Sequence, residues 1–227
     1  MQTESFIPGK DASLEASIQS MQAKLEALGF HIEERSWLNP IANVWSVHIR
    51  DRDCPILFTN GKGASEKAAL ASALGEYFER LGCHYFWTHY YLGAAIAERE
   101  YVHYPQEKWF PFGEDERWPE GLLDAELQAF YNPDETVKAH ALVEHNSGNV
   151  ARGICALPYQ RQRDGATLWF PVNIIGNLYV SNGMSAGNSP AEARVQALSE
   201  IFERHVKFRI IAEGLCLPDV PDAVIAR

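Results

Sequence analysis

An eight-residue phrase occurs twice in this chain, at residues 73–80 and again at residues 197–204. The first copy reads ALGEYFER and the second reads ALSEIFER, so six of the eight positions are identical. Each copy lies downstream of an Asn-Gly pair, Asn60-Gly61 or Asn182-Gly183, which we expect to turn the chain at the end of an apolar, strand-like run. The repeat therefore predicts two units of strand, glycine loop and helix. Two units are too few for a solenoid, so we interpret them as a duplication that builds two halves of one site.

The first copy predicts a helix with one polar stripe. At about 100° per residue, that stripe carries Ser72, Glu76, Glu79 and Arg80. Most other positions between residues 68 and 86 are apolar, so we expect this helix to be buried on most sides. A carboxylate on such a helix has to be neutralised, paired or bound to a metal, because an unpaired buried charge is costly or shifts its pKa.

The second copy predicts a matching stripe that carries Glu192, Gln196, Glu200 and Glu203. The opposite face of this helix is apolar, so the acidic face has an alternative interpretation as an ordinary solvated surface. Ser189, Pro190 and Glu192 also form a capping-box pattern, which would give Glu192 a purely structural role at the helix start. The repetition of the stripe favours an acidic site shared by the two helices.

The residues of the two stripes suit magnesium and phosphate. Carboxylates on two helices are ligands for a hard cation such as Mg²⁺, which commonly bridges to the phosphates of a substrate. Three cations are available to contact phosphate directly: Lys10, Arg80 and Arg204. The loop at residues 183–188 offers backbone N–H groups and small hydroxyls at a helix start, which suits an anion. The loop at residues 61–63 is similar but shorter, and neither loop matches a Walker motif. A di-iron site is disfavoured because neither stripe contains the Glu-x-x-His element, and Glu-x-x-Glu-Arg stands in its place.

Two other functions stay open at this point. Residues 183–187 read G-x-S-x-G, the nucleophile elbow of serine hydrolases, with Ser185 as the candidate nucleophile. Against this, the helix start lies at Ser189, and His205 precedes Asp219 and Asp222 where the hydrolase order requires an Asp before the His. The third function is a nucleotide-binding accessory module without chemistry of its own.

Composition limits the class of protein. The 227 residues, of which 46% are hydrophobic, allow one large or two small domains. The net charge of −10 argues against direct binding of nucleic acid, which needs a basic patch. The four cysteines lack metal-ligand spacing and predict a reducing compartment, so we expect a cytoplasmic location. No export leader and no apolar run of 18 residues is present, so neither export nor membrane insertion is predicted.

The pattern along the chain predicts an α+β fold of mixed α/β character. Leu14 to Leu28 have helical periodicity up to Gly29, with Asp11 as the expected N-cap. The expected strands are residues 30–34, 43–50, 54–59, 137–143, 168–172 and 178–180. Residues 101–136 contain many helix and strand breakers, and we interpret them as an irregular surface elaboration with a short helix near 122–130. A turn is expected at residues 146–149.

With Ser72-x-x-x-Glu76-x-x-Glu79-Arg80 paired to Glu192-x-x-x-Gln196-x-x-x-Glu200-x-x-Glu203-Arg204, the chain resembles the YcaO family. Residues 7–11 and 173–188 look specifically like its enterobacterial branch, described as accessory to a ribosomal protein methylthiotransferase. The resemblance runs over essentially the whole chain and implies a YcaO-type ATP-binding fold. It also implies Mg- and ATP-dependent phosphorylation of a backbone amide, after a nucleophile adds to its carbonyl, to give an azoline, thioamide or amidine.

The resemblance also implies roles for individual residues. The implied magnesium ligands are Glu76, Glu79, Glu200 and Glu203, and the implied catalytic residues are Glu76, Glu203 and Arg204. The residues expected near the ribose and phosphates, or supporting them, are Lys10, Ser17, Ser72, Ser185, Asn188, Glu192, Gln196 and Arg204.

The family resemblance further implies what lies around this chain. Family members continue well beyond the equivalent of residue 227, so we expect residues 1–227 to be the N-terminal portion of a YcaO ATP-binding domain. The implied partners are a peptide or protein substrate, with a ribosomal protein as one candidate, and a methylthiotransferase. A homodimer is left open by the sequence.

Overall fold

A computed structural model describes residues 4–83, 85–87, 93–145, 150–177 and 182–225. The chain divides into two compact units. Unit 1 consists of residues 1–83 and 181–227, and unit 2 consists of residues 84–180. Both units contain helices and a three-stranded sheet, which confirms the predicted mixture of helices and strands. None of the helices in the described ranges has the length and apolarity required to cross a bilayer.

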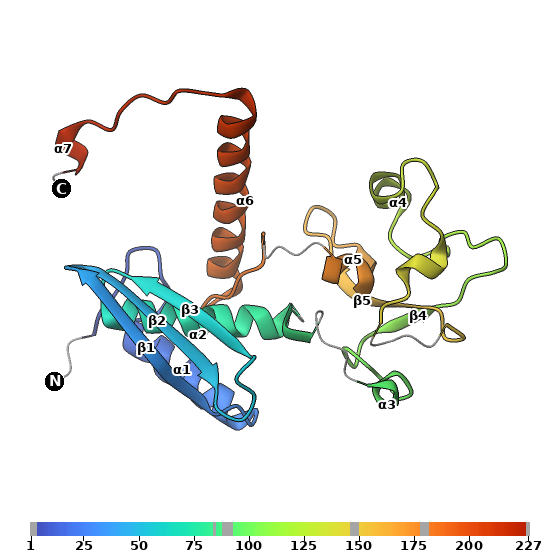
Figure 1. The fold of residues 1–227 in the computed structure, drawn as a ribbon, viewed down its shortest axis with the longest axis horizontal. Coiled ribbons are helices and arrows are strands. Elements are labelled where there is room, and N and C mark those ends of the chain that lie inside the picture. Colours follow the sequence, from blue (N-terminus) through green and yellow to red (C-terminus); the bar gives the residue numbers. More distant parts are fainter. Residues whose placement is uncertain (1–3, 84, 88–92, 146–149, 178–181, 226–227) are drawn as a thin grey trace. The chain divides into compact units, whose positions relative to one another are not determined.

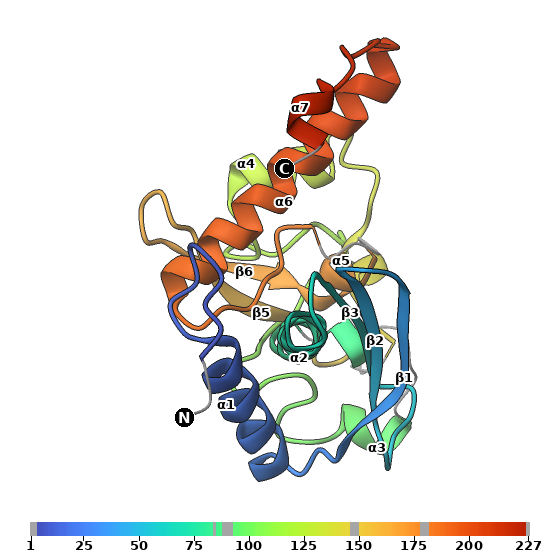
Figure 2. The ribbon, with the colours of Figure 1, turned by 90° about the vertical axis from the view of Figure 1, so that its left-hand side faces the viewer.

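Unit 1 is built on an antiparallel sheet of β1 (Ile32–Ile41), β2 (Val44–Asp51) and β3 (Phe58–Gly63). Two helices, α1 (Leu14–Ala27) and α2 (Glu66–Gly82), cover one face of this sheet (Figure 1). Figure 2 shows α2 end-on, between α1 and the sheet. Its buried residues pack against the inner face of the sheet, so α2 is the central element of the core of unit 1.

The predicted turn at Asn60-Gly61 is wrong, because both residues lie inside β3, opposite His48 and Val47 of β2. Gly61 serves a different purpose from the one its sequence context suggests. A Cβ atom at this position would lie 1.9 Å from the carbonyl oxygen of Ala69 on α2. The glycine therefore lets the backbone of β3 approach the helix closely. The second pair behaves as predicted, since residues 182–183 form a turn with Gly183 at φ 81°.

The helix starts show how far the repeat extends. Ser65 caps α2 by accepting a hydrogen bond from the Ala68 N–H, and Ser189 caps α6 (Pro190–Glu213) in the same way with the Glu192 N–H. The two caps are 124 residues apart (189 − 65), as are the two repeated phrases (197 − 73). The start of α6 is thus as predicted. The predicted cap of α1 is wrong, because Ser13 and not Asp11 accepts from the Ala16 N–H.

The ends of the two long helices differ from each other. The first ends at Gly82, earlier than expected, and Tyr85–Trp87 form a separate 3-10 turn. The second ends at Gly214, whose φ of 60° is the left-handed conformation typical of a helix C-terminus. A short helix α7 (Asp222–Ile225) follows.

Unit 2 has its own core. Its antiparallel sheet consists of β4 (Lys108–Phe110), β5 (Ile154–Gln160) and β6 (Thr167–Pro171). Three short helices accompany the sheet: α3 (Ala94–Ala97), α4 (Ala125–Tyr131) and α5 (Val172–Asn177). The interpretation of residues 101–136 as a surface elaboration is wrong, because Phe110 and Leu122 in this segment lie at the centre of the core.

Two further expectations fall in unit 2. The strand predicted at residues 137–143 is a 3-10 turn, Ala139–Leu142, in which the two end residues are both buried. Residues three positions apart lie on the same side of a 3-10 turn. In a strand they would point to opposite faces of the sheet. The strand predicted near residue 168 is confirmed as β6, whereas β5 was missed. The turn at residues 146–149 and the strand at residues 178–180 lie outside the described residues.

Candidate functional site

The two copies of the repeated phrase make the same ion pair. On α2, Arg80 Nη2 lies 2.9 Å from Glu76 Oε1, and on α6, Arg204 Nη2 lies 2.7 Å from Glu200 Oε1. Both pairs have the i, i+4 spacing that places side chains one above the other on a helix. The duplicated sequence therefore folds into a duplicated Glu-Arg pair.

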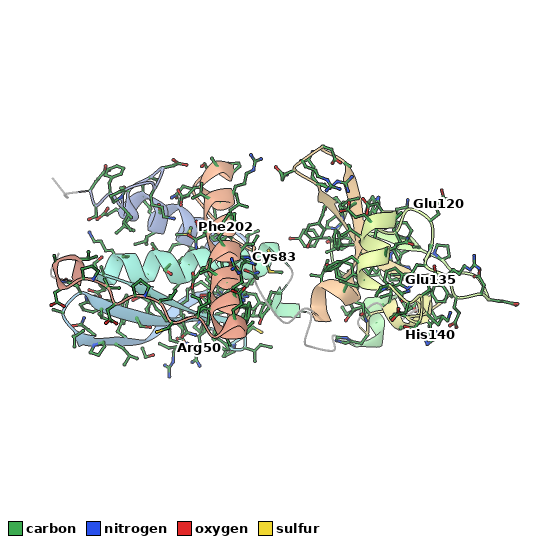
Figure 3. All side chains as sticks on the ribbon, turned by 90° about the horizontal axis from the view of Figure 1, so that it is seen from above. Arg50, Cys83, Glu120, Glu135, His140 and Phe202 are labelled. Atoms are coloured by element: carbon green, nitrogen blue, oxygen red, sulfur yellow. The ribbon has the colours of Figure 1, made fainter. Side chains whose placement is uncertain are left out.

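Glu79 shows that the two stripes approach each other. Its side chain is only 15% exposed, and burial raises its pKa from 4.5 to about 7. Arg80 opposes this rise in pKa, Glu76 and Glu200 increase it, and Arg204 opposes it. Because Glu200 and Arg204 belong to α6, the charges of both helices act on this one carboxyl group. In Figure 1, α6 runs away from α2 and only its lower end lies near that helix, and Figure 3 labels Phe202 on α6 and Cys83 just beyond α2.

The start of the chain is joined to the start of α6 by predicted site residues. Lys10 Nζ lies 3.2 Å from Glu192 Oε1, and the Asp11 N–H donates to Glu192 Oε2 at 3.1 Å. Ser17 Oγ donates to Asn188 Oδ1 at 2.8 Å, and Asn188 Nδ2 donates to Glu192 Oε2 at 3.0 Å. The structure thus brings together four of the expected nucleotide-binding residues, from positions more than 170 residues apart in the chain.

Glu192 does more than cap a helix. Its side chain is 6% exposed. Burial raises the pKa of Glu192, but the hydrogen bonds from the Asp11 N–H, Asn188 and Lys10 outweigh burial and hold that pKa below its usual value. A capping box would direct the carboxylate to the Ser189 N–H. Here the carboxylate instead binds the segment that precedes α1, while Ser189 Oγ donates to the carboxylate of Asp11. Asp11 therefore belongs to this network, a role that its assignment as a cap of α1 had concealed.

Ser185 is held by the backbone of α6. Its Oγ donates to the carbonyl oxygen of Ala193 at 2.5 Å. A serine nucleophile needs its hydroxyl to donate to a base, usually a histidine. His205, the one histidine considered for that role, lies exposed on α6. The contact therefore gives the serine hydrolase no support and assigns Ser185 a structural bond.

The remaining predicted residues lie on the same two helices but are exposed. Ser72 on α2 and Gln196 on α6 occupy equivalent positions in the repeat, and so do Glu79 and Glu203. Unlike Glu79, Glu203 is exposed. Throughout the described part of the chain, no three side chains of the Asp, Glu, His and Cys types are gathered closely enough to hold a metal ion by themselves.

The repeat also relates two glycines, Gly63 and Gly187, whose equivalence sequence reasoning missed. A Cβ atom at Gly63 would lie 2.6 Å from the Ala69 N, and a Cβ at Gly187 would lie 2.6 Å from the Ala193 N. Each glycine lies two residues before its capping serine and contacts the first turn of its helix. The signal was available, because the spacing of 124 residues (187 − 63) is that of the two phrases.

Comparison with known proteins gives relatives of this chain. It is 62% identical over 225 residues to the "Ribosomal protein S12 methylthiotransferase accessory factor YcaO" of Escherichia coli (strain K12), covering 99% of this chain and 38% of that protein. It is 60% identical over 227 residues to an "Uncharacterized protein" of Haemophilus influenzae (strain ATCC 51907 / DSM 11121 / KW20 / Rd), covering 100% of this chain and 39% of that protein. The chain thus spans 38–39% of the length of these curated relatives.

A solved structure and a family model complete the comparison. "The structure of YcaO from Methanopyrus kandleri bound with AMPPCP and Mg2+" matches with a TM-score of 0.54 at 17% identity, over 97% of this chain and 50% of that chain. At this identity the likeness shows a shared fold. The family model described as "YcaO cyclodehydratase, ATP-ad Mg2+-binding" matches residues 60–227, which contain both copies of the repeat. The chain therefore belongs to the YcaO family.

Proposed function

We propose that this chain carries the carboxylate and cation groups of a Mg²⁺- and ATP-dependent enzyme that activates a backbone amide of a peptide or protein. The observation that carries the proposal is the environment of Glu79, where the duplicated Glu-Arg pairs of α2 and α6 act on one carboxyl group that is only 15% exposed. Four residues would hold magnesium under this proposal: Glu76, Glu79, Glu200 and Glu203.

The donor set fits magnesium bound together with phosphate. Mg²⁺ is usually held by one or two carboxylates, water and the phosphates of the substrate, and seldom by a cage made only of protein groups. Because no three such side chains gather closely in the described residues, water and the phosphates of the substrate would have to supply the remaining ligands under this proposal. Burial and the neighbouring Glu76 and Glu200 disfavour the ionised form of Glu79. A bound cation would favour that ionised form, because opposite charges nearby lower the pKa of a carboxyl group.

The cations beside the stripes fit the phosphates of a nucleotide. Arg80 and Arg204 hold the carboxylates in place through ion pairs, and each guanidinium has further N–H groups that can donate to phosphate. Lys10 and Asn188 lie at the N-terminus of α6, a helix of 24 residues whose first N–H groups attract an anion. These residues would bind and orient the phosphates, with Ser17 holding Asn188.

The substrate proposal rests on the relatives. Bound ATP would supply the phosphoryl group that turns an amide oxygen into a leaving group. The Escherichia coli relative is named as an accessory factor of a ribosomal protein S12 methylthiotransferase. We therefore propose a peptide or protein amide as the substrate, a ribosomal protein as the first candidate, and a methylthiotransferase as a partner.

The proposal is tested by ATP binding in the presence of Mg²⁺, measured by calorimetry on Glu76→Gln and Glu203→Gln variants. We expect each variant to weaken binding at least about tenfold, since removing one charged contact costs roughly 1.5–3 kcal/mol. Glu213→Gln is the matched control, because Glu213 also forms an i, i+4 ion pair, with Arg209 at 2.9 Å and in the reverse order, near the exposed end of α6. Undiminished binding in both site variants would contradict the proposal.

A second measurement separates catalysis from binding alone. Phosphate release is followed with the full-length Escherichia coli relative, ATP, Mg²⁺ and the S12 protein. Release that is lost when the position equivalent to Glu203 is changed to Gln supports the enzyme. Tight binding without release supports a nucleotide-binding accessory module. An active-serine probe should leave Ser185 unlabelled, because its hydroxyl is held by the Ala193 carbonyl.

A further inference from the structure

The helix α6 exposes the face that α2 buries. Four positions of α2 have no exposed surface, and all of them lie on the side that packs against the β1–β3 sheet: Ala69, Ala73, Leu74 and Tyr77. The repeat assigns four equivalent positions to α6: Ala193, Ala197, Leu198 and Ile201. Leu198 is 54% exposed and Ile201 is 40% exposed. The two helices share a sequence pattern, but only the first has a sheet against it.

The segment at residues 183–187 precedes α6 in the chain and runs beside it, as β3 precedes α2 and runs beside that helix. Gly61 of β3 lies against the carbonyl oxygen of Ala69, and Ser185, its equivalent, donates to the carbonyl oxygen of Ala193. Gly187 likewise repeats the close approach of Gly63 to the first turn of the helix. The path of the chain before each helix is therefore the same, and residues 183–187 occupy the place of a strand.

This segment has no neighbouring strand within the part of the chain that the structure describes. It belongs to neither of the two sheets, whereas β3 pairs with β2 along its whole length. Residues 183–186 are half-buried, and the Gly183 N–H donates to Glu200 Oε2 on α6 at 3.4 Å. Among the described residues, no backbone–backbone hydrogen bond involves residues 184–187. An extended backbone that packs against a helix on one side, and has no strand paired to it on the other, can form hydrogen bonds with an added strand.

We infer that residues 183–187 form the edge of a second sheet, whose other strands come from polypeptide outside residues 1–227 and cover Leu198 and Ile201. The curated relatives have the length for this, because this chain spans only 38–39% of them. A sheet like the first one needs little of that length, since β1–β3 occupy residues 32–63. Burial of two large apolar side chains would favour the association. The inference concerns the fold around α6 and does not depend on nucleotide binding.

The first test is hydrogen exchange without nucleotide and with EDTA, in this chain and in the full-length Escherichia coli relative. The backbone amides of residues 184–187, and those aligned with them in the relative, are compared. We expect exchange to be about 100-fold slower in the relative, since strand pairing protects amides that this chain exposes. Equally fast exchange in both proteins would overturn the inference. Slow exchange of these amides in this chain alone would also overturn the inference. Light scattering would then identify what covers them: a second copy if this chain is a dimer, or other parts of the same chain if it is a monomer.

The second test compares equivalent leucines of the repeat. Leu74→Ala should lower the Tm of this chain by about 5 °C or more, because it opens a cavity under the first sheet. Leu198→Ala should leave the Tm of this chain within about 2 °C, because Leu198 is exposed. In the full-length relative, truncation at both aligned positions should lower the Tm. An unchanged Tm of the relative at the Leu198 position would overturn the inference even if the exchange data were favourable.

Discussion

Glu79 is the residue on which the charges of the candidate site converge. Its counterpart in the repeat, Glu203, has the same neighbours in sequence but lies exposed. Burial is the largest cause of the raised pKa of Glu79, which is about 7. A carboxyl group that ionises near neutral pH responds to small changes of pH and to a bound cation, and this makes Glu79 the most sensitive reporter of the site.

A pH-dependent stability follows from that pKa. The folded protein keeps a proton on Glu79 up to about pH 7, whereas the unfolded chain releases it near 4.5. The contribution of Glu79 to stability is therefore present below pH 4.5 and is lost as the pH rises through 7. In EDTA, the free energy of unfolding of Glu79→Gln, relative to the unchanged protein, should increase by roughly 1–3 kcal/mol between pH 4.5 and pH 8.

Urea denaturation at several pH values measures this change. Glu213→Gln is the control, since Glu213 is paired on the exposed end of α6. A stability difference between Glu79→Gln and the unchanged protein that is independent of pH would show that Glu79 ionises at its ordinary pKa.

At the scale of elements, the packing of β3 on α2 decides where the acidic stripe of α2 lies. The helix can approach the sheet closely only because β3 has glycine at positions 61 and 63. That approach buries the apolar side of α2, and its polar stripe, with Glu76 and Arg80, is left beside α6. The fold of the element and the position of the site are thus set by the same contact.

Two glycine-to-alanine changes test the importance of this contact. Gly61→Ala should lower the free energy of unfolding by at least about 3 kcal/mol, because the new Cβ meets rigid backbone atoms of α2. Gly75→Ala, inside α2, should raise it by roughly 0.5–1 kcal/mol, since a Cβ there contacts nothing within 4 Å and alanine favours a helix. Chemical denaturation of both variants gives the comparison. A loss smaller than 1 kcal/mol for Gly61→Ala would contradict the close approach.

The sequence predicts the parts of the fold that depend on local patterns. The acidic stripes and the start of α6 are encoded by residues within one or two helical turns, and the structure confirms both helices. Asn60-Gly61 was misread because a glycine required for close packing has the same signature as a glycine in a turn. The strand β5 was missed because its buried run, Ile154 to Leu157, is short and is followed by Pro158, so periodicity could not identify it. The approach of α6 to Glu79 depends on contacts between distant segments, which no local pattern encodes.

At the scale of the whole molecule, the candidate site belongs to unit 1 and draws on both ends of the chain. Residues 10–17 and residues 188–192 are joined by the ion pair and hydrogen bonds around Glu192. The two segments belong to unit 1, and the 97 residues of unit 2 lie between them in the sequence. The network around Glu192 therefore closes unit 1, because it ties the first segment to the returning chain.

Replacing the cation of this network should destabilise unit 1. Lys10→Met leaves the buried carboxylate of Glu192 with hydrogen bonds but without a neutralising charge. We expect a decrease of roughly 1–3 kcal/mol in the free energy of unfolding. Lys24→Met, at an exposed position near the end of α1, should change it by less than about 0.5 kcal/mol. Equal stabilities for the two variants in denaturant would show that the ion pair with Glu192 does not hold the segments together.

The central claim is that the two halves of the repeat build one magnesium-nucleotide site. The most direct measurement is calorimetry of ATP binding, with and without Mg²⁺, for the unchanged protein, Glu79→Gln, Glu200→Gln and the double variant. It is made on this chain and on the aligned positions of the full-length Escherichia coli relative. We predict binding that requires Mg²⁺, a loss in each single variant, and a double variant that departs from additivity by more than about 0.5 kcal/mol, because both carboxylates act at one place. Additive losses, binding that is indifferent to Mg²⁺, or no binding in either protein would contradict the claim.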